Sequence, residues 1–474
     1  VYIHRPTLLF STIDKYARIP WKARVRTLFG IDDDEILPPE LIIQDELHLI
    51  AGPLGTIDGL YEIILDELFK KNNMRPKIIA STATIRNSDL QVKALYDRKN
   101  CIFPTQIRDI KNSFFAREGN ETEKASRLYL GVISNNVTQT TLLIRVYSAL
   151  FYAVKYIEQL GIYDEEIVDS FWTLVGYFNS IKELGGAVVQ IRNDVDGRYK
   201  YLVNNKFKNI MEDEPKKMHA HFSRYEELTS RNANNARIGE ILKNIENKHF
   251  IDEDGANPAY NYILATNMIS VGIDIDRLNL MIINGQPKLN AEYIQASSRV
   301  GRKTPSIVIT MYNSSKSRDI SHYEQFIRYH SNIYKYVEAT SVTPFANMAR
   351  EKALHSIIIS LARQLIGEMN SNEGASQVGK YMEQINEFKS VILKRAEDIA
   401  PEKREEVEKE LNKIIEKWES ISSGLGYVKN EKKNINKELL VNTEDEVTKS
   451  AGFKTLNSMR NVDTASNIYV KDNE

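Results

Sequence analysis

Cysteine is almost absent from this sequence, in which Cys101 is the only thiol among 474 residues. A single cysteine excludes an internal disulfide framework and is typical of proteins from a reducing compartment. The sequence also lacks any apolar run near the roughly 18 residues that a membrane-spanning helix needs, and no signal-peptide pattern opens it. We therefore expect a soluble, cytoplasmic chain that makes no contact with membranes.

An excess of charge of one sign is lacking as well. The 63 lysines and arginines are balanced by 64 aspartates and glutamates, which leaves a net charge of -1. No overall field draws such a chain to nucleic acid, so any binding of this kind needs a local basic groove. The length is sufficient for two or three domains with hydrophobic cores.

The most informative stretch joins an apolar strand to two adjacent carboxylates. Residues 41–43 are all aliphatic, and Asp45 and Glu46 follow them closely. This pattern predicts a buried parallel strand whose carboxyl end presents acid groups to a ligand crevice. In a phosphate-transferring ATPase, Asp45 would hold Mg²⁺ through water, and Glu46 would orient and deprotonate the attacking water. A strand that merely ends in an acidic cap is the alternative.

A second short buried strand is predicted at residues 77–80, and Ser81, Thr82 and Thr84 follow it. The intervening segment has apolar residues at helical spacing, which predicts a helix between two parallel strands. Hydroxyl groups at the end of the second strand can bond the neighbouring carboxylates and sense phosphate. A polar strand terminus without a function is the alternative here.

A third cluster lies downstream. On a helix, Gln295, Arg299 and Arg302 fall at positions i, i+4 and i+7, so the spacing places all three on one face. Two arginines and an amide on one face suit a triphosphate that is bound from an opposing lobe. A solvated basic helix is the alternative.

The remaining pattern indicates alternating strands and helices followed by a helical tail. From Phe345 on the sequence is mainly helical, and Pro401 separates two amphipathic stripes, which predicts a helical hairpin. Further short buried strands are predicted at residues 7–12, 172–178, 261–266, 280–283 and 306–311.

In this order, the segments between residues 7 and 312 resemble the helicases of superfamily 2. The strings that carry the resemblance are Thr12-Ile13-Asp14-Lys15 (similar to motif Ib), Asp45-Glu46-Leu47-His48 (Walker B), Ser81-Thr82-Ala83-Thr84 (motif III), Ala265-Thr266 with Gly272-Ile273-Asp274 (motif V), and Gln295 to Arg302 (motif VI). Within the superfamily, residues 45–55, 172–186 and 458–463 resemble the large helicase subunits of bacterial DISARM phage-defence systems.

The resemblance implies an α/β fold with two RecA-like lobes, the first of them incomplete, followed by a mainly helical C-terminal region. The implied domains are the end of the first lobe (1–115), a helical bridge (116–165), the second lobe (166–345) and a helical extension with a polar tail (346–474).

The resemblance also implies ATP and Mg²⁺ as cofactors, and movement along nucleic acid as the activity. The implied catalytic residues are Asp45, Glu46, His48, Gln295, Arg299 and Arg302, with Asp45 as the Mg²⁺ ligand through water. The residues implied to couple ATP to movement are Ser81, Thr82, Thr84, Gly272 and Asp274, and those implied to contact the nucleic-acid backbone are Thr12, Lys15 and Thr266. The implied partners are nucleic acid, with DNA favoured over RNA, and other subunits of the defence system.

Two features depart from the family. Ser298 replaces a usual glycine of motif VI, but the arginines keep their spacing. More seriously, no Gly-x-x-x-x-Gly-Lys-Ser/Thr phosphate loop occurs in the sequence, and Gly301-Arg302-Lys303-Thr304 only echoes one. The loop precedes motif Ib in this fold, and the chain opens at Val1. We therefore expect a part of a larger protein that is inactive in hydrolysis without the missing segment.

Three functions remain open at this point. The first is an ATP-dependent helicase or translocase, favoured by Glu46, Arg299 and Arg302 together. The second is a non-catalytic nucleic-acid-binding scaffold with a degenerate ATP site. The third is an α/β domain that binds another ligand.

Overall fold

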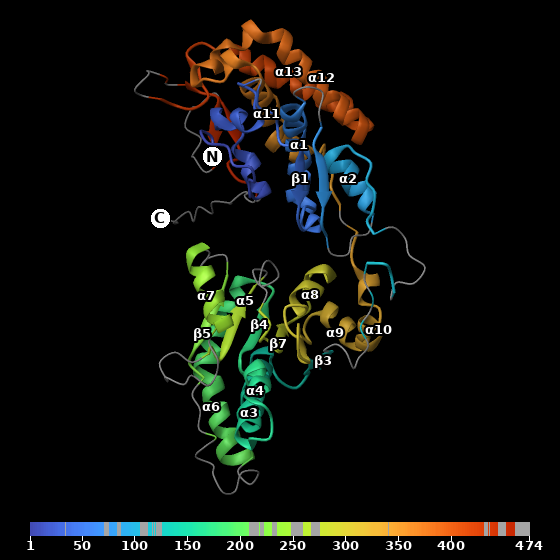
Figure 1. Cartoon of the computed structure of the whole chain (residues 1–474), viewed down its shortest axis with the longest axis vertical. Coiled ribbons are helices and arrows are strands. Elements are labelled where there is room, and N and C mark those ends of the chain that lie inside the picture. Colours follow the sequence, from blue (N-terminus) through green and yellow to red (C-terminus); the bar gives the residue numbers. More distant parts are fainter. Residues whose placement is uncertain are drawn as a thin grey trace, which may run out of the picture. The chain divides into compact units, whose positions relative to one another are not determined.

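The computed structural model divides the chain into two compact units (Figure 1). Unit 1 comprises residues 1–103 and 339–474, and unit 2 comprises residues 104–338. The structure describes residues 1–33, 35–70, 75–82, 87–104, 112–115, 117, 119, 126–207, 218, 222–229, 235–247, 259–266, 275–339, 341–430, 435, 437–443 and 452–459.

Unit 2 is built on a six-stranded sheet whose described neighbours all pair in parallel, in the order β3-β8-β7-β4-β6-β5. The strands are β3 (Arg127–Ile133), β4 (Leu174–Phe178), β5 (Tyr225–Leu228), β6 (Tyr262–Ala265), β7 (Leu280–Asn284) and β8 (Ser306–Tyr312). Parallel strands require crossover connections, and helices supply them here. The predicted α/β class is thereby confirmed.

Successive residues of the central strands enter two different cores. In β4, Leu174 and Phe178 join one core, and Val175 and Tyr177 join the other. The same alternation runs through β6, β7 and β8, because side chains along a strand point alternately to its two faces. Position 176 in β4 requires glycine, because a Cβ there would lie 2.4 Å from the hydroxyl of Tyr147 on the helix that covers this face. Both faces of this sheet are therefore covered, as an apolar parallel sheet requires.

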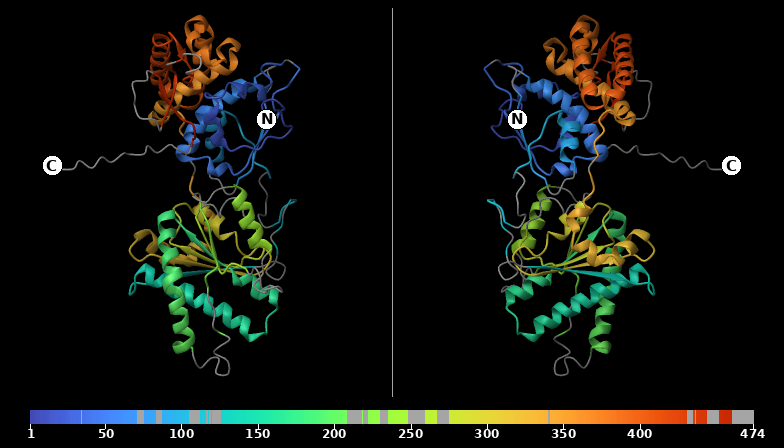
Figure 2. Two further views of the ribbon diagram at one scale, coloured as in Figure 1. Left: turned by 90° about the vertical axis from the view of Figure 1, so that its left-hand side faces the viewer. Right: turned by 90° about the vertical axis from the view of Figure 1, so that its right-hand side faces the viewer.

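The helices of unit 2 divide between these two faces. Helices α3 (Gln139–Leu160) and α5 (Ile181–Gln190) pack into the first core, whereas α7 (Asn235–Asn247) and α8 (Asn290–Ser297) pack into the second. Figure 2 shows α3 and α7 on opposite sides of the strands. The other helices are α4 (Glu165–Trp172), α6 (Asp196–Tyr201), α9 (Ser317–Glu324) and α10 (Phe326–His330).

The segment predicted as a helical bridge, residues 116–165, is not purely helical. It contains strand β3, which forms an edge of the sheet, and most of this segment's length lies in β3 and α3 of unit 2. The alternating burial of β3 is weak, with Leu128 and Leu130 exposed, and an edge strand of this kind gives a poor strand pattern in the sequence.

Unit 1 combines the N-terminal residues with the C-terminal helical region around one core. Its described strands include the parallel pair β1 (Leu41–Gln44) and β2 (Lys77–Ala80), and its longer helices are α1 (Gly52–Phe69), α2 (Ser88–Tyr96), α11 (Asn347–Leu365), α12 (Met382–Ile399) and α13 (Arg404–Ser420). Helices α1 and α11 lie side by side (Figure 1) and are buried over most of their length. Helices α12 and α13 form the predicted hairpin and complete the core. Near the C-terminal end, the short strands β9 (Leu425–Gly426) and β10 (Lys437–Glu438) pair, as do β11 (Leu440–Asn442) and β12 (Phe453–Thr455).

The predicted burial of strand 41–43 is wrong for one of its faces. Leu41 and Ile43 are 48% and 65% exposed, whereas Ile42 packs against the helical core. Among the described residues, β1 pairs with β2 alone, and helices cover one face of this pair. The strand predicted at residues 7–12 is absent, and its apolar side chains are exposed, because no described strand pairs with this segment.

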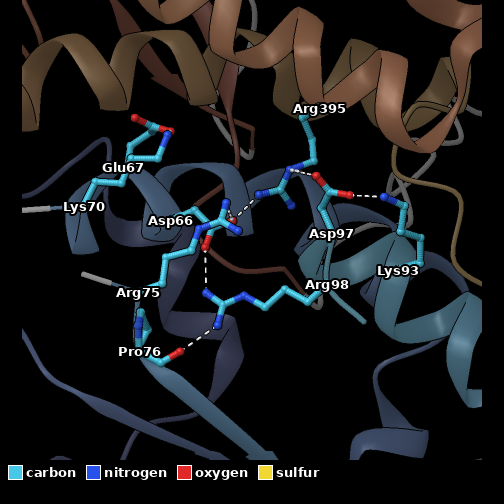
Figure 3. Close-up of polar contacts among 9 residues, drawn as sticks. All are labelled: Asp66, Glu67, Lys70, Arg75, Pro76, Lys93, Asp97, Arg98 and Arg395. Atoms are coloured by element: carbon cyan, nitrogen blue, oxygen red, sulfur yellow. Dashed lines mark hydrogen bonds and ion pairs between the residues drawn. The ribbon is translucent and has the colours of Figure 1, made fainter. Parts of the chain in front are cut away.

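A buried ion pair links α12 to α1 in this unit (Figure 3). The carboxylate of Asp66 on α1 is 5% exposed and pairs with the guanidinium of Arg395 on α12. It also accepts a hydrogen bond of 3.0 Å from Nη2 of Arg98, whose Nη1 donates to the carbonyl of Pro76 directly before β2. One carboxylate therefore links the C-terminal helices to the strand that leads to Ser81.

Within the described ranges, no helix combines the length and apolar character needed to cross a membrane.

Candidate functional site

The predicted acidic and hydroxyl residues of unit 1 meet at the carboxyl end of β1 and β2. The two strands are in register from Leu41 opposite Lys77 to Gln44 opposite Ala80, so Asp45 and Ser81 follow at the same edge. The Ser81 hydroxyl donates to Oδ1 of Asp45, and the backbone N–H of Glu46 donates to the same oxygen over 3.0 Å. Asp45 itself is exposed. A fixed carboxylate thus has one oxygen held by the protein and an open side.

Glu46 occupies an uncommon backbone conformation directly after this carboxylate. Its φ of 51° and ψ of 49° lie in the left-handed region, which costs a residue with a Cβ about 1–2 kcal/mol. Such strain tends to persist at functional sites, where surrounding contacts hold it. Here the contacts come from His48, whose Nδ1 lies 3.4 Å from Oε2 of Glu46 and 3.3 Å from the hydroxyl of Thr82. The four predicted residues Glu46, His48, Ser81 and Thr82 are therefore brought together with Asp45.

A buried glutamine that the motif pattern did not indicate supports this turn. Gln91 of α2 is 1% exposed, and its Nε2 donates to the carbonyls of Leu47 and Ile50 over 3.0 and 2.8 Å. These carbonyls follow Glu46, so Gln91 fixes the turn that carries the two carboxylates. Its partners are backbone atoms some 41 to 44 residues away, which no local sequence signal identifies.

The motif VI residues of unit 2 do not share one helical face as predicted. Helix α8 ends at Ser297, so only Gln295 lies on it, and Arg299 and Arg302 follow in an irregular segment. Gly301, four residues after the end of α8, has φ +69°, and its N–H donates to the carbonyl of Leu278 over 2.9 Å. Gln295 is buried, Arg299 is half-buried and Arg302 is exposed. The arginines are presented by a loop rather than by a helix.

The remaining predicted residues belong to other elements or lie outside the described part of the chain. Thr12 precedes a short 3-10 helix, η1 (Ile13–Arg18), and both Thr12 and Lys15 are exposed. Thr266 is 5% exposed at the carboxyl end of β6 in unit 2. Thr84, Gly272 and Asp274 lie outside the described residues.

The C-terminal segment anchors the turn at Thr12. Oδ1 of Asp14 accepts hydrogen bonds from the Ser458 hydroxyl over 2.6 Å and from the Met459 N–H over 2.7 Å. Two strings that are 444 residues apart in the sequence therefore meet in unit 1.

A cavity of about 510 Å³ at the carboxyl edge of the unit 2 sheet was not predicted from the sequence. It is lined by residues at the ends of β4 and β7 and at the N-termini of α3 and α5, together with Lys182 and Lys316. Ser180 caps α5 by accepting a hydrogen bond from the Glu183 N–H. Helix N-termini and lysines both favour an anion such as a phosphate, while Glu183, which pairs with Lys316 over 3.3 Å, tempers this charge. The serine at position 180 after an apolar strand was the available signal.

Comparisons with known proteins agree with these features. The family described as the helicase conserved C-terminal domain matches residues 200–304, which lie in unit 2. The chain contains a helicase C-terminal domain.

The chain is also similar along its length to a protein of known name. It is 38% identical over 514 aligned residues to DISARM protein DrmA of Bacillus paralicheniformis, and the alignment covers 99% of the chain and 44% of DrmA. The chain therefore spans a little under half the length of this relative. The family match and the relative confirm the resemblance to helicases and to DISARM subunits.

Two solved helicase structures are similar to this chain. The DUF1998 helicase MrfA bound to DNA is 15% identical, with a TM-score of 0.47 over 74% of this chain and 38% of MrfA. The Mycobacterium smegmatis helicase Lhr bound to ssDNA and AMP-PNP is 13% identical, with a TM-score of 0.43 over 74% of this chain and 38% of Lhr.

Proposed function

We propose that this chain is the part of an ATP-dependent nucleic-acid translocase that acts in phage defence and that it carries residues for both hydrolysis and strand contact. The observation that carries the proposal is the strained turn of unit 1. In this turn Asp45 accepts a hydrogen bond from the Ser81 hydroxyl, and the adjacent Glu46 lies beside His48, which in turn contacts the Thr82 hydroxyl. A scaffold protein has no need of a catalytic carboxylate held in an unfavourable conformation.

The donor set at Asp45 fits a magnesium ion bound through water. Mg²⁺ keeps most of its waters and takes one or two carboxylates, and Asp45 offers one exposed carboxylate beside the Ser81 hydroxyl. The ion would neutralise charge on the bound phosphates. Glu46 is then the residue that orients and deprotonates the attacking water, and His48 fixes the position of the Glu46 carboxylate.

The arginines of unit 2 complete the catalytic set in this proposal. Arg299 and Arg302 neutralise the charge that develops on the transferred phosphoryl group, a role that is worth about 10³ to 10⁵ in rate in related enzymes. Gln295, Ser81 and Thr82 link the state of the nucleotide to the movement of the protein.

Nucleic acid is proposed to bind through its phosphates. Thr12, Lys15 and Thr266 are the predicted contacts, and the lysine-lined cavity beside α3 and α5 adds a second phosphate site on unit 2. Contacts of this kind give affinity without base specificity, as a translocase requires. DNA is the proposed track, and other subunits of the defence system are the proposed partners.

The test is ATP hydrolysis by the full-length protein with and without single-stranded DNA. Glu46→Gln and Arg302→Ala should each lower the stimulated rate by about 10³-fold or more. The first removes the base that deprotonates the attacking water, and the second removes a cation that neutralises charge on the transferred phosphoryl group. Glu40→Gln and Arg328→Ala change an exposed glutamate and an exposed arginine elsewhere and serve as matched controls. Hydrolysis that is absent from the wild type, or that is unaffected by both substitutions, would overturn the proposal in favour of a binding scaffold.

A further inference from the structure

A side chain of the edge strand β3 holds the backbone on both sides of Arg299. Nε of Arg127 donates to the carbonyl of Val300 over 2.7 Å, and its Nη2 donates to the carbonyl of Ser298 over 3.3 Å. These two carbonyls flank Arg299 in the sequence and come directly after the last residue of α8. A single planar guanidinium therefore spans the segment that presents the arginine.

Arg127 provides hydrogen-bond donors for backbone carbonyls at and just after the end of α8. Ser298 is the C-cap residue of α8, and the last carbonyls of a helix have no partner within the helix, so a cation near them is favoured. Val300 lies beyond the helix, and its carbonyl accepts a second hydrogen bond from the same guanidinium. A guanidinium satisfies two carbonyls at once because its donors form a rigid fork. Arg127 supplies this fork from a residue 171 to 173 positions earlier in the sequence.

The same short segment is restrained from two other directions. A Cβ at Gly301 would lie 2.0 Å from Oγ of Ser306, the residue that pairs with Arg127 across the two strands. On the same face of β3, two residues after Arg127, the Tyr129 hydroxyl lies 3.2 Å from the hydroxyl of Ser297. Strand β3 therefore contacts the segment at both of its ends, and Arg127 makes the contacts nearest to Arg299.

We propose that Arg127 is a positioning residue that sets the direction of Arg299 and Arg302 during nucleotide hydrolysis. The inference rests on the proposed function, and it assigns to a strand outside all the helicase-like motifs a role in presenting the motif VI arginines. Arg127 acts through the backbone of residues 298–301 and touches no nucleotide. Without the Arg127 guanidinium, the loop loses the two hydrogen bonds to the carbonyls of Ser298 and Val300 that restrain its backbone.

The test compares hydrolysis with the binding of a transition-state mimic in the full-length protein. Arg127→Met keeps the apolar stem and removes the fork, and it should lower kcat by about 10²-fold, the effect expected of a displacement near 1 Å. Its KM for ATP and its affinity for ADP should stay within about twofold of the wild type. Its affinity for ADP with aluminium fluoride should fall by the same factor as kcat, because only the mimic engages aligned arginines.

Two further variants make the result decisive. Arg127→Lys keeps the charge but cannot hold both carbonyls, so it should lose about tenfold in kcat, and it replaces Arg127→Met if that variant does not fold. Arg145→Met removes an exposed arginine of α3 and should leave all the measured values unchanged.

The outcomes separate this inference from the proposed function. If Arg302→Ala abolishes hydrolysis while Arg127→Met leaves kcat unchanged, the positioning role is wrong and the proposed function stands. If Arg127→Met lowers the melting temperature and weakens ADP and its fluoride complex equally, Arg127 merely seals the sheet edge and the positioning role is again wrong. If neither Glu46→Gln nor Arg302→Ala affects hydrolysis, the proposed function itself fails.

Discussion

Strand β4 of unit 2 and strand β1 of unit 1 meet their surroundings in different ways. In β4 every residue is buried, and alternate side chains enter two separate cores. In β1 only Ile42 packs against a core, while Leu41 and Ile43 on the other face are about half exposed or more. Both strands end at edges that carry the candidate functional residues. Cores cover both faces of the sheet in unit 2, but only one face of β1 in unit 1.

The comparison teaches that unit 1 depends on its helices and on buried charge. Helices α1 and α11 supply a large part of its core, together with residues of α12, α13 and the C-terminal segment. The Asp66 carboxylate joins α1 to α12. Unit 2, in contrast, is held by apolar contacts on both faces of its strands. Substitutions of charge and of apolar volume should therefore act unequally on the two units.

The largest expected effect is that of Asp66→Ala. The change leaves the Arg395 guanidinium, which is 6% exposed, without its closest carboxylate, and breaking a buried pair in this way costs about 3–5 kcal/mol. Hydrogen exchange followed by mass spectrometry should register faster exchange in α1 and α12, with unit 2 unchanged. Lys70→Ala breaks a pair with an exposed lysine on the same helix and should cost less than about 1 kcal/mol. Equal effects of the two changes would show that the ion pair between Asp66 and Arg395 does not stabilise unit 1.

A matched pair of isoleucines tests the two strand environments directly. Ile282→Ala in β7 removes a fully buried side chain and should destabilise unit 2 by about 2–5 kcal/mol. Ile43→Ala in β1 removes a side chain that is 65% exposed and should cost less than about 1 kcal/mol. Hydrogen exchange of each unit measures both losses. Similar losses at the two positions would contradict the exposed face of β1.

The third prediction concerns pH and one buried carboxyl of α1. Burial, together with the charge of Asp66, raises the pKa of Glu62 from 4.5 to about 8, against the opposing effect of Arg395 and Arg98. The folded state therefore keeps a proton that the unfolded chain has released, so unit 1 loses stability as the pH rises from about 4.5 to about 8. The slope for one proton is at most about 1.4 kcal/mol per pH unit.

The measurement compares wild type with Glu62→Gln, which cannot ionise. We expect the stability of the variant, relative to wild type, to increase as the pH rises from 5 to 8. Each protein is equilibrated in urea at each pH, and pulse hydrogen exchange at a single pH then gives the urea midpoint of unit 1. Glu351→Gln removes an exposed carboxylate of unit 1 and controls for the loss of one charge. A difference that stays constant over this range would mean that Glu62 does not hold a proton in the fold.

Sequence patterns predicted the features that depend on local periodicity and motif order. The strands near residues 41, 77, 262, 280 and 306 occur as predicted, because unbroken aliphatic runs bounded by polar residues suffice to indicate them. The meeting of Asp45 with Ser81 followed from parallel pairing of two such strands. The helicase family match covers residues 200–304, which include the motif VI string, and the alignment with DrmA covers 99% of the chain.

The unpredicted features all depend on partners that are far apart in the sequence. Gln91 and Arg127 act on backbone carbonyls, which every residue possesses, so no side-chain pattern marks their targets. The end of α8 at Ser297 was not predicted, because Gln295, Arg299 and Arg302 keep helical spacing and nothing in that spacing marks the irregular segment that carries the two arginines. Likewise, the exposed face of β1 could not be inferred from a run of residues that is equally apolar on both faces.

The smallest expected effect sharpens the comparison at the level of ligand binding. If the cavity of unit 2 holds a phosphate of the strand, Lys182→Ala and Lys316→Ala should each weaken binding of single-stranded DNA, and each should reduce the dependence of log K on log salt by about 0.7. Glu183→Gln should act in the opposite direction, because it removes the carboxylate that pairs with Lys316. Lys409→Ala on α13 of unit 1 changes an exposed lysine that does not line the cavity and should leave the slope unchanged. Fluorescence anisotropy of labelled single strands at several salt concentrations measures all four variants. A slope that responds to Lys409→Ala as strongly as to Lys182→Ala would mean that the strand senses only the general charge of the protein, and the cavity would then have no part in its binding.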